Sequence, residues 1–175
     1  MKIGFIGLGR LGMPCAVAIA MKGHDVMGFD CVTRVLNKTA CSYRETGPDG
    51  VSDFNRYLRE SPLRFGTLEE VARHSEMIFV AVQTPHRAEF EGTTRITAAR
   101  ADFDYSYLVN AIRGLAEVVH KDTIVVIIST VLPGTIRNVV VPLIHERMKL
   151  VYNPFFIAMG TTMQDFLNPE FVLLG

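Results

Sequence analysis

The sequence predicts an α/β fold in which a doubly wound, mainly parallel sheet is flanked by helices. Short apolar runs alternate with longer segments of helical period along the chain, a pattern typical of parallel strands joined by crossover helices. With 175 residues and a hydrophobic content of 49%, the chain can also bury a core of single-domain size. We find no repeat, low-complexity tract or linker in the sequence and expect one domain over residues 1–175.

The first strand–helix–strand unit is the clearest part of this pattern. Residues 2–6 (KIGFI) form an apolar strand, 7–12 a glycine-rich turn, and 13–23 a helix. Residues 24–30 follow as a second strand that ends on Asp30.

The middle of the chain continues the alternation with a short irregular helix, a regular helix, a weak strand, another helix and an apolar strand. These are expected at residues 32–50, 51–61, 63–66, 68–74 and 76–82. Thr67 and Glu70 match the T-x-x-E capping box, which opens the helix at 68–74.

The second half begins with a long charged loop over residues 83–103, which we interpret as a solvated excursion. Asp104 is expected to cap the next helix, whose apolar residues recur at helical spacing. Later elements are a strand at 122–130, a helix at 133–148, a strand at 149–152, a helical turn at 163–167 and a buried strand at 171–174. A strand that completes a domain and then stops indicates a domain boundary, so we expect the sequence to be a fragment of a longer protein.

The glycine-rich turn carries the first functional signal. Gly7, Gly9 and Gly12 form the G-x-G-x-x-G pattern after a strand and before a helix. The three glycines permit a tight turn, close approach of a pyrophosphate and close packing of helix on strand, as in Rossmann-type domains. With Arg10 and Leu11, which complete the turn, they are our candidate cofactor-binding residues, and a structural glycine turn is the alternative.

Asp30 lies at the end of the second strand, where a carboxylate can accept hydrogen bonds from both ribose hydroxyls of a dinucleotide. A carboxylate there repels a 2′-phosphate, which favours NAD over NADP. Arg34 follows shortly after and is a further candidate, because it can stack on adenine or tolerate such a phosphate.

Three other strand ends are expected to meet at the same edge of the sheet, where ligands of open α/β sheets bind. Val82 and Thr84 end one strand, Thr130 the next, and Asn153 the last. We select Val82, Thr84 and Thr130 as cofactor-binding candidates, although a hydroxyl at a strand end can also serve only as a helix cap.

Composition excludes several other classes. Eighteen basic and eighteen acidic residues leave no net charge, so we expect small-molecule or protein partners, no nucleic acid and no membrane. The apolar runs are far shorter than the roughly 20 residues of a membrane span, and we expect a cytoplasmic protein. The three cysteines are expected to be reduced thiols, and the five histidines lack metal-binding spacing.

Several motifs in order make the chain resemble the amino-terminal NAD-binding domain of the UDP-glucose/GDP-mannose dehydrogenase family. They are GFIGLGRLGMP, VQTP, DYSYL, STVLPGT and NPFFIAMGTTMQDFLNPEFVLLG. The resemblance implies NAD-dependent, two-step oxidation of the C6 alcohol of a nucleotide sugar through an aldehyde held on a cysteine. It also implies that this cysteine and most substrate contacts lie in a second domain absent from this sequence, and that the full-length enzyme is a homodimer.

The resemblance places the glycines, Asp30, Thr84 and Thr130 on cofactor-side positions, and implies that Thr130 orients a water or the substrate hydroxyl. The chain departs from the family where N-P-E-F-L-x-E-G carries two glutamates, because Phe155 and Met159 stand there. Neither side chain can exchange a proton. Three alternatives are open: a base from elsewhere, such as His86 or Glu89 of the long loop, replaces them, the reaction stops at a different oxidation state, or the protein no longer catalyses it.

Two alternatives to a nucleotide-sugar dehydrogenase remain open. The chain can be a non-catalytic NAD-binding module, which the loss of both glutamates favours. It can also be a relative of the 3-hydroxyacid dehydrogenases, whose openings are similar to GFIGLGRLGMP but which lack the closing stretch.

Overall fold

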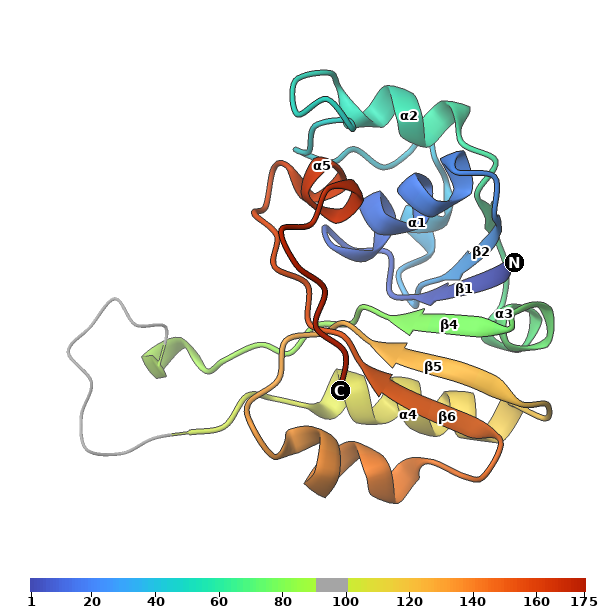
Figure 1. The fold of residues 1–175 in the computed structure, drawn as a ribbon, viewed down its shortest axis with the longest axis vertical. Coiled ribbons are helices and arrows are strands. Elements are labelled where there is room, and N and C mark those ends of the chain that lie inside the picture. The colour runs from blue at the N-terminus through green and yellow to red at the C-terminus, as the bar shows by residue number, and fades with distance from the viewer. Residues whose placement is uncertain (91–100) are drawn as a thin grey trace.

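One six-stranded sheet forms the centre of the computed structural model, which describes residues 1–90 and 101–175 (Figure 1). The strands are β1 (Lys2–Ile6), β2 (Asp25–Phe29), β3 (Arg64–Phe65), β4 (Met77–Val80), β5 (Thr123–Ile127) and β6 (Met148–Tyr152). Their order is β3-β2-β1-β4-β5-β6, and every neighbouring pair is parallel. The expected fold class is therefore confirmed. The order reverses between β1 and β4, which is where open sheets of this kind bind ligands.

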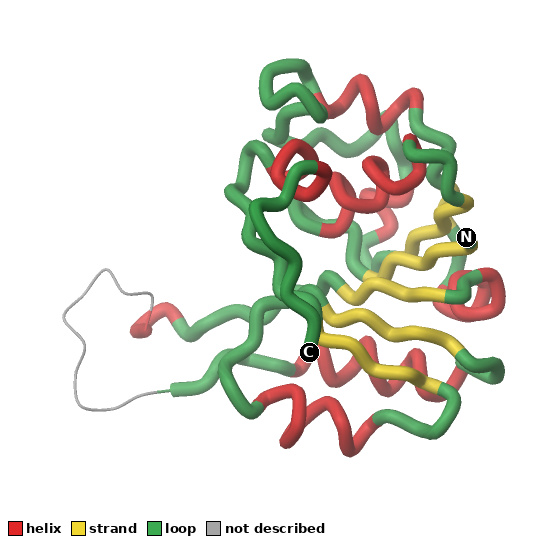
Figure 2. The backbone as a smooth tube through the Cα atoms, viewed as in Figure 1, coloured by secondary structure: helices red, strands yellow, loops and turns green. Residues whose placement is uncertain are grey.

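Helices cover both faces of the sheet (Figures 1 and 2). One face carries α1 (Gly12–Met21), α2 (Phe54–Glu60) and α5 (Thr162–Leu167), and the other carries α3 (Leu68–His74) and α4 (Ser106–Val118). Phe5 and Ile6 of β1 show why there are two cores, since successive strand residues point to opposite faces. Phe5 packs into the core beneath α1 and α2, whereas Ile6 packs into the core beneath α3 and α4.

Local sequence signals explain the start of α3 and the burial of one side of α4. The capping box of α3 is present as expected, with Thr67 accepting from the Glu70 N–H and the Glu70 carboxylate accepting from the Thr67 N–H. At α4 the N-cap is Tyr105 rather than the expected Asp104, although the Asp104 carboxylate accepts from the Ser106 N–H at 2.9 Å. The apolar side of α4 is buried as predicted, through Leu108, Ile112, Leu115 and Val119.

Two expected elements differ in the structure. The regular helix expected at 133–148 is instead a π-helical turn, η3 (Ile136–Val140), followed by a 3-10 turn, η4 (Val141–Leu143). Pro142 explains this, because it has no N–H for a continuous helical ladder.

The buried strand expected at 171–174 is wrong as well, since these four residues are exposed and outside the sheet. After α5 the chain runs back over the ends of the strands, and only Gly175 pairs with the Tyr152 backbone, at 2.8 and 2.9 Å. To form a buried strand, an apolar segment needs a neighbouring strand to pair with as well as hydrophobic side chains. The sequence pattern shows only the hydrophobic side chains.

In the part of the chain that the structure describes, no helix has the length and apolar character required to cross a membrane. The expected loop at 83–103 contains the short helical turn η2 (Ala88–Phe90). Residues 91–100 of that loop, on which part of the solvated-excursion prediction falls, lie outside the described residues.

Candidate functional site

The glycine loop between β1 and α1 is shaped by its three glycines, each in a different way. Gly7 has φ +91°, and a Cβ there would meet the Ala81 carbonyl oxygen at 2.5 Å, so the turn needs glycine. A Cβ on Gly12 would overlap the Gly7 carbonyl oxygen, so the start of α1 can pack this closely only without a side chain. Gly9 differs, because a Cβ there would have no neighbour within 4 Å. Its exposed backbone is open to a ligand, and the loop therefore fits a dinucleotide pyrophosphate.

The N-terminus of α1 adds a favourable potential for an anion. The first turn carries no acidic residue, and no side chain caps the N-terminal N–H groups. A helix end of this kind has roughly half a positive charge. Arg10 precedes α1 with a side chain that is 62% exposed, while Leu11 is half-buried against the core under the helix. Arg10 can therefore reach a bound anion with its side chain, and Leu11 only through its backbone.

Asp30 lies beside the glycine loop, as expected. Its Oδ2 accepts from the Leu8 N–H at 2.7 Å, and its Oδ1 accepts from the Val32 N–H at 2.8 Å. Each carboxylate oxygen keeps a second acceptor site for a hydroxyl. Arg34 belongs to the short turn η1 (Thr33–Leu36) after β2 and is exposed, with its Nε donating to the Ala40 carbonyl at 3.3 Å.

The ends of β4, β5 and β6 converge, as the sequence predicted. Thr84 Oγ1 donates to the Thr130 carbonyl at 2.6 Å, and Ser129 Oγ donates to the Val82 carbonyl at 2.8 Å. The Asn153 N–H donates to Ile127 at the end of β5, at 2.9 Å. Thr130 itself is exposed. The described residues named here present hydroxyl and backbone groups at this edge.

Tyr105 fixes the turn that follows Thr130, a role that the sequence did not reveal. Its buried hydroxyl donates to Asp102 at 2.7 Å and accepts from the Leu132 N–H and the Thr135 hydroxyl at 3.2 and 3.0 Å. Burial raises the pKa of Tyr105. It therefore acts as a neutral structural hydroxyl.

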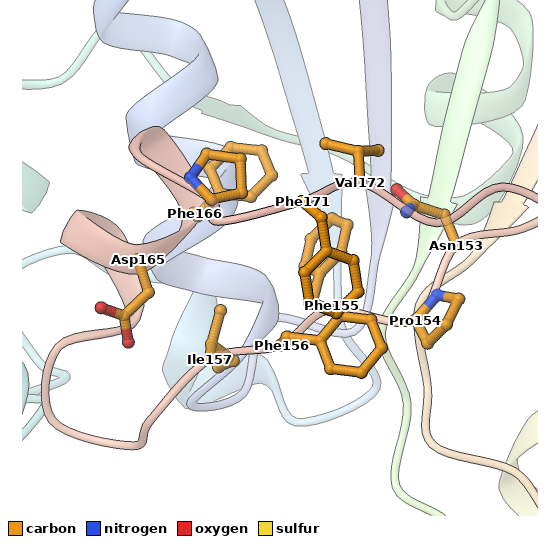
Figure 3. Close-up of a pocket in the computed structure, with 10 residues that line it drawn as sticks. Asn153, Pro154, Phe155, Phe156, Ile157, Asp165, Phe166, Phe171 and Val172 are labelled. Atoms are coloured by element: carbon orange, nitrogen blue, oxygen red, sulfur yellow. The ribbon is translucent and has the colours of Figure 1, made fainter.

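The stretch 153–160 forms an aromatic pocket rather than an acidic one (Figure 3). Phe155 points inward, with its ring centre 5.1 Å from Phe166 and 6.5 Å from Phe79. The cavity beside it measures about 130 Å³. Met159 is 56% exposed and lies outside that lining.

Among the described residues that line this cavity, Asp165 is the ionisable one, and its carboxylate already has partners. Its Oδ2 accepts from the Ala158 N–H at 2.8 Å and from the Thr161 hydroxyl at 2.9 Å. It therefore anchors the loop at the start of α5. His86 and Glu89, the replacement bases considered from the sequence, are exposed and make no hydrogen bond to the described stretch 153–160. Neither of these two residues therefore supplies the missing proton acceptor to the stretch 153–160 in the described structure.

Sequence reasoning missed Tyr43 and Glu45, which lie in the expected turn-rich region. The Tyr43 hydroxyl donates to the Leu8 carbonyl of the glycine loop at 2.7 Å. Glu45 is 6% exposed and accepts from the Gly160 N–H at 2.9 Å. Their residue types do not distinguish them from the exposed polar and charged residues nearby in the sequence.

The cysteines do not form a reactive centre. Cys15 is completely buried, and desolvation, followed by the charge of Glu45, raises its thiol pKa far above the usual range. Cys31 is exposed and Cys41 is partly buried, and all three are free thiols. Among residues 1–90 and 101–175, no group of three His, Cys, Asp or Glu side chains could hold a metal ion.

A parallel sheet that reverses order beside a glycine loop, with an uncapped helix end and a carboxylate at the next strand, defines a Rossmann-type dinucleotide-binding domain.

Comparisons with known proteins specify the family. The model of the UDP-glucose/GDP-mannose dehydrogenase family, NAD binding domain, matches residues 1–175. The chain therefore belongs to the UDP-glucose/GDP-mannose dehydrogenase family and corresponds to its NAD-binding domain. The UDP-glucose 6-dehydrogenase of Rickettsia bellii is 30% identical over 181 residues, which cover 100% of this chain and 39% of that protein.

Comparison with solved structures agrees with this family assignment. The ternary complex of GDP-mannose dehydrogenase from Pseudomonas aeruginosa matches with a TM-score of 0.80 and 26% identity, over 100% of this chain and 41% of that one. The UDP-glucose dehydrogenase of the archaeon Pyrobaculum islandicum shares the fold, with a TM-score of 0.77. The chain thus spans about two fifths of the length of these relatives.

Proposed function

We propose that residues 1–175 are one domain, the NAD-binding half of a two-domain dehydrogenase that oxidises the C6 alcohol of a nucleotide sugar. The observation that carries the proposal is the construction of the glycine loop. The loop is closed by backbone at Gly7 and Gly12, open at Gly9, and bonded to the carboxylate of Asp30. Such a loop accommodates a pyrophosphate beside a ribose-binding acid.

Each candidate residue has a role in this proposal. The glycine loop, Arg10 and the N-terminus of α1 hold the pyrophosphate, with Leu11 contributing its backbone. Asp30 accepts from the ribose hydroxyls, and the exposed Arg34 lies beside the adenine. Bound NAD supplies the hydride acceptor.

The strand ends complete the proposed site. Val82 and Thr84 line the cofactor, and the exposed hydroxyl of Thr130 orients the substrate hydroxyl or a water. The hydrogen bond from Thr84 to the Thr130 backbone supports this arrangement, because it holds the two strand ends together.

Calorimetry with NAD and NADP tests the cofactor assignment. We expect NAD to bind at least about tenfold more tightly, because the carboxylate of Asp30 repels a 2′-phosphate. Asp30→Asn removes the charge with little change in size and should narrow this preference. Tighter binding of NADP to the unchanged protein would contradict the assignment.

Formation of NADH from a panel of UDP- and GDP-sugars, with the full-length protein, tests the activity. We expect one sugar nucleotide to reduce NAD. The second candidate function, a non-catalytic NAD-binding module, is favoured by the packed Phe155 and the exposed Met159 at the two positions of the family's glutamates. NAD binding without NADH formation on any sugar of the panel would support that module instead.

The proposal extends to the setting of the whole protein. We place it in the cytoplasm as a homodimer that takes a nucleotide sugar mainly through its second domain. Three free thiols are consistent with a reducing compartment. Sedimentation of the full-length protein checks the dimer.

A further inference from the structure

Residues 43–46, which we call the strap, join the glycine loop to the stretch 153–160. At one end the Tyr43 hydroxyl donates to the Leu8 carbonyl at 2.7 Å. At the other end both the N–H and the hydroxyl of Thr46 donate to the Gly160 carbonyl, each at 2.8 Å. Two segments more than a hundred residues apart are thereby held by one short piece of chain.

Glu45 is the charged centre of the strap, and its side chain has no exposed surface. Its Oε2 accepts from the N–H groups of Gly160 and Thr162 at 2.9 and 3.2 Å. Its Oε1 is buried without a hydrogen-bond partner. The nearest opposite charge is Arg10 of the glycine loop, whose Nε lies 3.8 Å from Oε1.

A buried carboxylate oxygen without a hydrogen-bond donor lowers the free energy of unfolding. A glutamate at this position therefore requires an explanation. The two backbone N–H groups need only one acceptor atom, and the amide oxygen of a glutamine would supply it. The negative charge, which a glutamine would lack, lies next to the positive charge of Arg10 and, in addition to burial, raises the thiol pKa of Cys15. Because the contact is made through Nε, the two terminal nitrogens of the guanidinium remain available to a phosphate, which arginine can bind with a pair of hydrogen bonds.

We propose that Glu45 is a positioning residue for pyrophosphate binding, which holds Arg10 by its Nε so that the terminal nitrogens face the phosphates. The proposal rests on the proposed function, in which the glycine loop binds NAD. An exposed arginine otherwise loses rotamer freedom when it binds, and a pre-oriented one loses less.

A double-mutant cycle on NAD affinity, measured by calorimetry, tests the role. We expect Glu45→Gln to weaken NAD binding roughly threefold to tenfold, because one oriented, charge-assisted contact to phosphate is lost. Arg10→Met should weaken it at least as much. The double variant, Arg10→Met with Glu45→Gln, should bind NAD as tightly as Arg10→Met alone, because Glu45 acts through Arg10.

Two ligands and one matched variant separate positioning from general support of the fold. ADP-ribose keeps the pyrophosphate and should show the same loss with Glu45→Gln, whereas adenosine, in competition with NAD, should show none. Thr46→Val removes a strap contact to Gly160 without touching Arg10, and should leave NAD affinity unchanged. The positioning role would be overturned if Glu45→Gln weakened NAD binding by the same factor in the presence of Arg10 and in the Arg10→Met background. It would also be overturned if Glu45→Gln weakened adenosine binding as much as NAD binding.

Arg10→Lys gives a measurement that does not depend on the folding of a Glu45 variant. Lysine keeps the charge but has no Nε to face the carboxylate, so we expect it to restore only part of the affinity lost in Arg10→Met. Full restoration overturns positioning by Glu45. Absence of NAD binding to the unchanged protein would overturn the proposed function itself, and the two failures are therefore distinct.

Discussion

Gly9→Ala is expected to weaken NAD binding at least about tenfold while the free energy of unfolding stays the same or rises by up to about 1 kcal/mol. A Cβ at Gly9 meets no atom within 4 Å, and the residue does not require positive φ. The folded protein therefore tolerates alanine, which also restricts the unfolded chain. The added methyl group occupies the space through which a pyrophosphate approaches the backbone.

Gly12→Ala is the matched comparison, because the same added atom meets a different environment. Its Cβ would overlap the Gly7 carbonyl oxygen and lie 3.1 Å from the Ala81 Cβ. We expect this variant to lose about 1–3 kcal/mol of stability through overpacking, together with NAD affinity. Calorimetry and urea unfolding measure the two quantities. If Gly9→Ala destabilised the protein as Gly12→Ala does, or bound NAD normally, the open face at Gly9 would not be the pyrophosphate site.

Phe155→Glu is expected to lower the free energy of unfolding by about 2–4 kcal/mol at neutral pH. The ring that it replaces contacts Phe166 and Phe79, and large-to-small changes of core aromatics cost about 3–5 kcal/mol when burial is complete. Phe155 is only half-buried, which reduces the packing loss, but a carboxylate among aromatic rings adds a desolvation cost.

The pH dependence separates that charge from the lost packing. An acid in an apolar site has its pKa raised in the folded state above the ordinary value of about 4.3. Its contribution to stability is therefore greatest below that ordinary value and is lost as the pH rises through the raised one. Urea unfolding of Phe155→Glu between pH 4 and 8 should show stability falling relative to the unchanged protein, whereas Phe155→Ala should show a constant difference.

Met159→Glu is the control at the second position of the family pattern. Since Met159 is 56% exposed and lies outside the aromatic cavity, we expect this variant to change the free energy of unfolding by no more than about 0.5 kcal/mol. Equal losses at both positions would mean that Phe155 is not a packing residue. The two positions thus differ in structure: Phe155 is half-buried and packs against the core, whereas Met159 is a surface residue that an acid can replace.

Much of the fold could be read from the sequence because the signals are local. Alternating strand and helix periods predict a parallel sheet, and the T-x-x-E pattern at Thr67 opens α3 as expected. The buried strand expected at 171–174 is absent, because strand pairing depends on a neighbour that the pattern of one segment does not contain.

The sequence by itself determined the dinucleotide loop and the acid at Asp30, because glycine spacing and strand length specify them within a single strand–helix–strand unit. It also determined that Phe155 and Met159 carry no acid. Only the tertiary structure decided what the turn-rich region does. Glu45 contacts Gly160 across more than a hundred residues, and a contact of that range depends on the packing of α1 and α5 on one face of the sheet.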